Sequence, residues 1–123
     1  MLKLLLDEHI SLGVAAGLRR RIPSLAARGL ADWEAGAFLG QDDAIFLRHA
    51  ATHRWTLVTD DRRTIPPLLK AWAEAGQHHG GVIFVDDKTI SPSDIGGQVR
   101  ALTALAREGA AWDWTDRVCF LRR

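Results

Sequence analysis

The sequence has little of several features that would mark it as a member of a particular class of protein. It has one cysteine, Cys119, in 123 residues, so no disulfide can form within the chain, as suits a reducing cytosol. Its net charge of +1 gives no overall basic field of the kind that marks many nucleic-acid binders, so any attraction for a polyanion must be local. The apolar runs are too short to span a membrane, and Met1 leads into a strand-like segment without the pattern of a signal peptide. We therefore expect a cytoplasmic protein that forms one domain over residues 1–123.

Short apolar segments alternate along the chain with segments of helical periodicity. A hydrophobic fraction of 47% is enough for a core, and apolar runs without alternation are typical of parallel strands buried on both faces. Strands are predicted over 2–6, 24–28, 55–59, 80–85 and 117–121, and helices over 12–20, 42–54, 66–75 and from Ser91-Pro92 to Gly109. The alternation predicts an α/β fold, a three-layer α/β/α sandwich around a mainly parallel sheet of four to five strands.

Acidic residues follow the first and the central predicted strands and also open the helix between them. They are Asp7 and Glu8, then Asp42 and Asp43, then Asp60 and Asp61. Ligands bind beyond the carboxyl ends of the strands in open α/β sheets, so these acids are expected to converge at one edge. The alternative is structural, because carboxylates at such places also turn the chain or cap the next helix. A capping carboxylate can still offer an oxygen to a metal, so the two interpretations are compatible.

Carboxylates held close together repel one another and need a counter-charge. Mg²⁺ prefers oxygen ligands and keeps several waters, so it suits an open carboxylate cluster. Such a metal lowers the pKa of bound water and stabilises a phosphoryl transition state, which makes phosphodiester hydrolysis the natural reaction. His9, Arg62 and Arg63 lie beside the acids and are candidates for holding a nucleic-acid backbone. Thr59 is a fourth candidate, because its hydroxyl could orient Asp61 or a metal-bound water; each of the four could equally be an ordinary surface or strand residue.

Four short motifs follow one another along the chain. They are Leu-Leu-Leu-Asp-Glu-His-Ile-Ser over 4–11, Asp-Asp-Ala-Ile over 42–45, Leu-Val-Thr-Asp-Asp over 57–61 and Gly-Gly-Val-Ile over 80–83. Their order and spacing resemble the small bacterial PIN-like proteins, relatives of VapC-type toxin ribonucleases, over most of the chain. The resemblance implies a PIN-like fold, Mg²⁺- or Mn²⁺-dependent RNA cleavage and a partner antitoxin encoded alongside. It assigns the catalytic metal site to Asp7, Asp42 and Asp61, with Glu8, Asp43 and Asp60 as second-rank ligands.

The sequence departs from the family pattern in two places. His9 stands where the family usually has Asn, and Arg63 and Thr64 stand where it usually has an Asp-Phe pair. A fourth carboxylate is therefore missing from its usual place, and Asp86 or Asp87 is the alternative. The loss keeps open a second hypothesis, a PIN-like module without catalysis that serves only to bind a partner.

A third hypothesis, from another class, is a phosphoacceptor signalling domain. That function needs a lysine at the end of a later strand, and Lys88 is the only candidate. Trp112 and Trp114 are expected either in the packing or on a surface that meets an antitoxin or a second copy in a homodimer.

Two pairs of histidines complete the candidates. His49 and His53 are four residues apart, so they share a helix face and could hold a metal, although no third ligand is evident. His78 and His79 could contact RNA or a partner, and a polar loop before a strand explains them as well.

Overall fold

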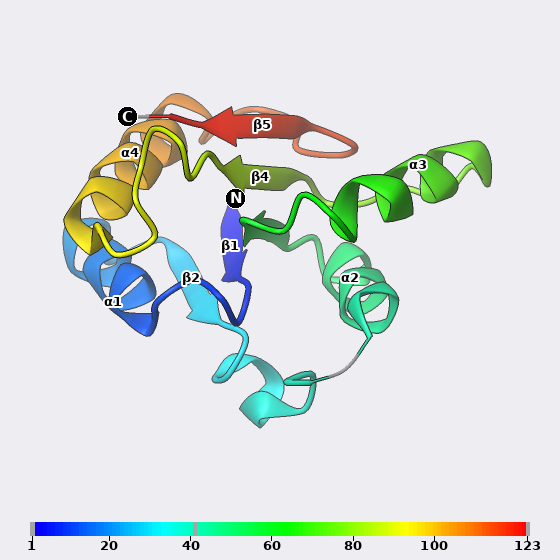
Figure 1. Cartoon of the computed structure of the whole chain (residues 1–123), viewed down its shortest axis with the longest axis horizontal. Helices are drawn as coiled ribbons and strands as arrows, with labels where there is room; N and C mark the ends of the chain where they lie inside the picture. Colours follow the sequence, from blue (N-terminus) through cyan, green and yellow to red (C-terminus); the bar gives the residue numbers. More distant parts are fainter. Residues whose placement is uncertain (1, 41, 123) are drawn as a thin grey trace.

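A five-stranded, all-parallel sheet forms the centre of the structure, a computed structural model that describes residues 2–40 and 42–122 (Figure 1). The strands are β1 (Lys3–Leu6), β2 (Ala26–Gly29), β3 (Thr56–Thr59), β4 (Val82–Val85) and β5 (Val118–Leu121). The helices are α1 (Leu12–Arg21), α2 (Asp43–Thr52), α3 (Ile65–Glu74) and α4 (Ile95–Glu108), with a short 3-10 helix, η1, at Trp33–Gly36. The predicted three-layer α/β/α fold is confirmed, and all four strand pairs are parallel.

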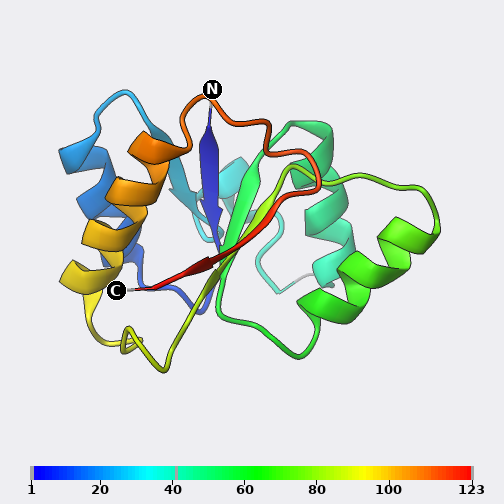
Figure 2. The ribbon, with the colours of Figure 1, turned by 90° about the horizontal axis from the view of Figure 1, so that it is seen from above.

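The helices cover the two faces of the sheet in pairs, α1 with α4 and α2 with α3 (Figure 2). Successive residues of a strand point to opposite faces, so Leu4 and Leu6 lie in the core beneath α1 and α4, and Leu5 lies in the core beneath α2 and α3. None of the three is more than 1% exposed. This burial on both faces is the reason that β1 and its neighbours β3 and β4 are largely apolar along their whole length.

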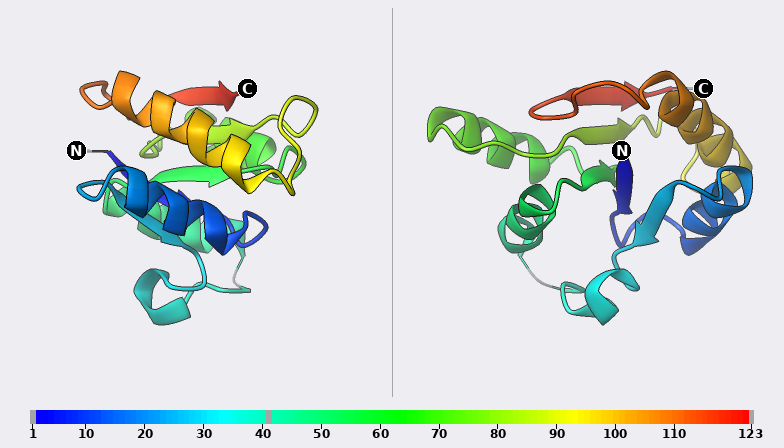
Figure 3. Two further views of the ribbon diagram at one scale, coloured as in Figure 1. Left: turned by 90° about the vertical axis from the view of Figure 1, so that its left-hand side faces the viewer. Right: turned by 180° about the vertical axis from the view of Figure 1, so that it is seen from behind.

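Helices α1 and α4 lie side by side across one face of the sheet (Figure 3, left). Their close approach depends on Gly17, because a Cβ at this position would lie 2.7 Å from a methyl carbon of Val99. Any larger residue at position 17 would push the two helices apart.

The order of the strands is β2-β1-β3-β4-β5, so the chain leaves β1 toward one side and returns on its other side as β3. Leu6 is in register with Val58, which places the residues after β1 beside the end of β3. In open parallel sheets the crevice at such a reversal is where ligands bind. The fold therefore brings the segments after β1 and β3 to the place where a site is expected.

Two element boundaries differ from the prediction. The last helix begins at Ile95 and not after Ser91-Pro92, because Asp94 is its N-cap and accepts a hydrogen bond of 2.8 Å from the N–H of Gly97. The Ser91 carbonyl instead accepts the N–H of Asp94 and closes a separate turn. Strand β2 covers Ala26–Gly29, shifted toward the C-terminus from the predicted 24–28.

The structure decides between the alternatives for two aromatic and histidine side chains. Trp114 is 7% exposed and its indole N–H donates to the carbonyl of Gly109 at 2.9 Å, so it is a core residue and does not form a partner surface. The His49 ring stacks on Phe38, with 4.8 Å between ring centroids, and meets Trp33 edge-on, so it fills an aromatic cluster. Among the residues that the structure describes, no helix is long and apolar enough to cross a membrane.

Candidate active site

Asp7 is the buried acid of the candidate site. It directly follows β1, is 7% exposed, and its N–H donates to the carbonyl of Val58 in β3 at 2.9 Å. Its Oδ2 accepts a hydrogen bond of 2.6 Å from the hydroxyl of Thr59. A buried carboxylate costs free energy unless it is hydrogen-bonded, and Thr59 provides that bond. The carboxyl group of Asp7 is thus fixed at the junction of β1 and β3.

The hydroxyl of Thr59 also holds Asp61 in place. Its N–H donates to Oγ1 of Thr59 at 3.0 Å, and its Oδ1 accepts the N–H groups of Arg63 and Thr64 at 2.8 and 2.9 Å. Partial burial alone would raise the pKa of Asp61, but the hydrogen bonds from Thr64 and Arg63, with a smaller attraction to His9, outweigh it and lower this pKa. Asp61 is therefore held as a carboxylate, and one of its oxygens is used to turn the chain toward α3.

Asp43 faces the other acids, while Asp42 caps the helix. Asp42 is exposed, and its carboxylate accepts the backbone N–H two residues further on at 3.4 Å. Asp43 lies in the first turn of α2 and is half-buried. Burial raises the pKa of Asp43, and repulsion from Asp7 and Asp61 raises it further, with smaller contributions from Asp42 and Glu8. Of this pair, Asp43 therefore interacts with Asp7 and Asp61, whereas the carboxylate of Asp42 caps the helix.

The acids repel one another without forming a closed coordination shell. Within 2–40 and 42–122, no three His, Cys, Asp or Glu side chains lie close enough together to bind one metal ion directly. Joint ligation by Asp7, Asp43 and Asp61 would require their side chains to rotate. Mg²⁺ usually keeps several waters and takes only one or two protein carboxylates. The oxygen donors and their mutual repulsion fit such a loosely held ion, and Glu8 and Asp60 lie at the margin as exposed and half-buried acids.

The four predicted substrate contacts have different positions. Thr59 is fully buried and its hydroxyl is engaged with two acids, so it positions carboxylates and does not reach a substrate. Arg62 turns away from the acids, since its guanidinium pairs with Asp86 at 3.4 Å. Arg63 and His9 have exposed side chains next to Asp61, where they remain available to a polyanion.

Asp86 anchors two arginines at the neighbouring strand end. Its side chain is 12% exposed, and its two carboxylate oxygens lie 3.4 Å from Arg62 and 3.8 Å from Arg122. The acidic ending of β4 was visible in the sequence, but its arginine partners come from segments distant in the chain. Asp86 is thus neutralised within the protein, which argues against it as a replacement for the missing fourth acid.

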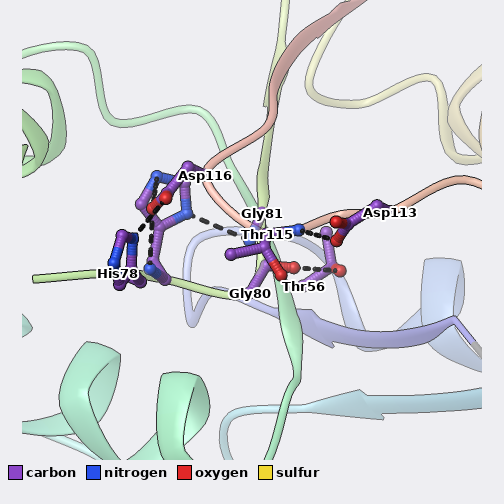
Figure 4. A network of polar contacts seen from close by, with 8 residues as sticks. Thr56, His78, Gly80, Gly81, Asp113, Thr115 and Asp116 are labelled. Carbon is purple, nitrogen blue, oxygen red and sulfur yellow. Dashed lines mark hydrogen bonds and ion pairs between the residues drawn. The ribbon is translucent and has the colours of Figure 1, made fainter.

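A second polar cluster lies at the opposite ends of the strands, where β4 and β5 begin (Figure 4). His79 is 7% exposed, and its Nδ1 accepts the N–H of Gly81 at 3.0 Å. Burial lowers the pKa of His79, and the nearby carboxylate of Asp116 opposes this only in part. His78 pairs through Nδ1 with Asp116 at 2.5 Å. The buried His79 is therefore a structural residue that holds the turn into β4 and is not an RNA contact.

Comparison of the chain with protein-family models, with curated proteins and with solved structures finds no match. The PIN-like resemblance stays a prediction from the four motifs, and the geometry at the ends of β1 and β3 has to support a function by itself.

Proposed function

We propose that this protein is a Mg²⁺- or Mn²⁺-dependent endoribonuclease whose metal site is formed by Asp7, Asp43 and Asp61. The observation that carries the proposal is that the Thr59 hydroxyl links the carboxylate of Asp7 to the backbone of Asp61 at the ends of β1 and β3. Asp43 lies close to both, because burial and then repulsion from Asp7 and Asp61 raise its pKa. Three acids from separate segments thus act on one another at the reversal of strand order, where ligands bind in such sheets. A cation placed among them would relieve this repulsion.

The chain prepares the acids in three different ways. Thr59 binds one oxygen of Asp7 and leaves the other for a ligand. Backbone N–H groups of Arg63 and Thr64 bind Oδ1 of Asp61 and hold this carboxylate in place. Asp43 comes from a helix and not from a strand end, since it lies in the first turn of α2. When bound, the metal would supply an acidified water and neutralise charge on the phosphate.

The same face offers weak positive charge for the substrate. Burial raises the pKa of Asp61, and the hydrogen bonds from Thr64 and Arg63 lower it. His9 lies close enough to Asp61 to lower this pKa a little further. Arg63 follows in the same turn with an exposed side chain. In this proposal both residues hold the RNA backbone beside the acids, and that binding weakens with added salt because each phosphate contact releases counterions.

Cleavage of single-stranded RNA by the purified chain tests the proposal directly. We expect cleavage with Mn²⁺ or Mg²⁺, no cleavage with EDTA, and loss of cleavage in Asp7→Asn, Asp43→Asn and Asp61→Asn. Asp113→Asn is the matched control, because Asp113 is an exposed acid in the loop before β5, at the opposite ends of the strands. If the three variants cut RNA at the wild-type rate while remaining folded, these acids are not the catalytic site.

The resemblance extends the proposal to a toxin of a type II toxin–antitoxin pair. Such a toxin would be inhibited by an antitoxin encoded beside it, so a small neighbouring reading frame whose product blocks the cleavage would support this role. A chain that binds that product but cuts no RNA with either metal would instead fit the PIN-like binding module without catalysis.

A phosphoacceptor domain is the second candidate, because the strand order 2-1-3-4-5 is also found in receiver domains. It requires a cation to neutralise the acyl phosphate on Asp60 or Asp61. Lys88 is exposed and lies after β4, and Arg122, which follows the last residue of β5, is paired with Asp86. Stable labelling of an aspartate by acetyl phosphate, without RNA cleavage, would favour this candidate.

A further inference from the structure

Strand β5 is an edge strand with an open side. In the part of the chain that the structure describes, it pairs with β4 alone. The N–H of Val82 bonds to the carbonyl of Arg117, and the N–H of Asp86 bonds to the carbonyl of Leu121, so residues 117, 119 and 121 turn toward β4. The peptide groups of Val118 and Phe120 therefore point away from the sheet, where they can pair with another strand.

The side chains at this edge are apolar and fixed in place. Val118 is 43% exposed and Phe120 is 54% exposed. The Phe120 ring stacks on Phe84 of β4, with 5.5 Å between centroids and an interplanar angle of 23°. A groove of about 360 Å³ runs beside them and is lined by Arg62, Pro66 and Leu69, with the Arg62 guanidinium 5.6 Å from the centre of the Phe120 ring. Edges of soluble sheets usually carry charges or proline within the strand, and Val118–Leu121 has neither.

We propose that the β5 edge binds the β5 edge of a second copy of this chain, antiparallel and about a two-fold axis, so that one sheet continues through both molecules. Only residues with outward peptide groups can pair across the axis, and we place the axis at Cys119, so that Val118 pairs with Phe120 of the second copy. Each Phe120 then lies beside Val118 of the other copy, over the groove formed with Pro66 and Leu69. This proposal does not depend on the proposed ribonuclease activity.

Charge on the other face of the edge favours a second copy over a different occupant. A groove of about 670 Å³ between α4 and β5 is lined along the helix by Arg100, Ala104 and Glu108. Arg100 and Glu108 stand two turns apart, and all three residues are exposed. A two-fold axis reverses the direction of α4, so Arg100 of each copy comes toward Glu108 of the other, with the small Ala104 between them.

The oligomeric state in solution tests the proposal. We expect sedimentation equilibrium to show a dimer for the wild type, and a monomer for Phe120→Lys. Ile45→Lys is the matched control, because Ile45 is 51% exposed on α2, away from the β5 edge, and should remain dimeric. Circular dichroism checks that each variant is folded. A wild type that stays monomeric up to about 1 mM, the limit of weak association, would overturn the proposal.

Charge reversal distinguishes a symmetric pairing from any other contact. Arg100→Glu and Glu108→Arg should each weaken the dimer roughly threefold or more, because exposed ion pairs contribute little individually but two are lost together. The double variant should restore wild-type dimerisation. A double variant that is no better than the single ones would rule out the antiparallel arrangement of α4.

Cys119 reports on the register of the strands. In the proposed pairing it lies opposite Cys119 of the second copy in a non-hydrogen-bonded pair, where Cα atoms are about 4.5 Å apart and within disulfide range. Diamide, which takes up two protons and two electrons from the two thiols, should therefore cross-link the dimer rapidly, and Phe120→Lys should abolish the cross-link. A dimer that resists cross-linking, or a monomer that binds single-stranded RNA through Phe120, would show that the edge has another arrangement or occupant and would overturn the proposal.

Discussion

The hydroxyl of Thr59 donates a hydrogen bond of 2.6 Å to Oδ2 of Asp7, a residue 52 positions earlier in the chain. The same oxygen accepts the N–H of Asp61 at 3.0 Å. One fully buried hydroxyl thus ties the end of β1 to the turn after β3. The candidate site depends on this link, because it fixes the direction of one carboxylate and the backbone of another.

Removal of the hydroxyl by Thr59→Val should destabilise the protein by about 1–3 kcal/mol, because the buried carboxylate of Asp7 loses its partner. If the acids bind metal, the affinity for Mn²⁺ should also fall by about 10- to 100-fold, as for other residues that orient metal ligands. Urea unfolding and Mn²⁺ titration measure the two effects. Thr59→Ser keeps the hydroxyl and should recover most of both; equal losses in the two variants would assign the effect to packing of the methyl group.

Asp43→Asn should change stability and cleavage, whereas Asp42→Asn should change neither. Asp43→Asn removes a charge that Asp7 and Asp61 repel, so the metal-free protein should become more stable at pH 7, while RNA cleavage is lost. Asp42→Asn keeps a good N-cap residue and should leave both stability and cleavage near the wild-type level. Thermal melting without metal and a cleavage assay test the pair. Loss of cleavage in Asp42→Asn alone would restore the original ranking of the two acids.

Added Mg²⁺ or Mn²⁺ should stabilise the folded protein, because the ion binds acids that come together only after folding. At 100 times the dissociation constant the gain is about 2.7 kcal/mol, which corresponds to a rise of roughly 5–15 °C in Tm for a domain of this size. Differential scanning fluorimetry at constant ionic strength measures the shift. The Asp7→Asn, Asp61→Asn double variant should show no shift, and a shift of the same size in that variant would place the ion elsewhere.

Stability should fall with acidification near pH 6, through His79. Its pKa in the folded state lies below the ordinary value of 6.5, mainly because of burial. Between these two pKa values the unfolded chain binds a proton that the folded chain does not, so the free energy of unfolding decreases as the pH falls below 6.5 and is constant above it. His79→Asn can still accept the N–H of Gly81 and does not titrate. Urea unfolding from pH 5 to 8 should show a smaller slope in this variant, and an unchanged slope would assign the effect to another group.

Much of the fold could be predicted because the central strands β1, β3 and β4 are buried on both faces, which requires the apolar runs at Leu4, Leu57 and Ile83 to be continuous. Burial leaves this direct signature in composition, and the alternation with helices follows from it. The start of α4 could not be predicted in the same way. Ser91-Pro92 and Asp94 are both acceptable starts of a helix, and the choice depends on which side chain reaches a free N–H group.

The sequence by itself determined the α/β class, the acids after the first and central strands, and the buried character of the sheet, because each is a local pattern of polarity. Only the tertiary structure decided that Asp43 faces Asp7 and Asp61, that Thr59 is buried between two acids, that Asp86 is neutralised by two arginines, and that β5 stands at an edge. These are relations between segments distant in the chain. They depend on strand order and on the rotation of a helix about its axis, and a local pattern of residues predicts neither.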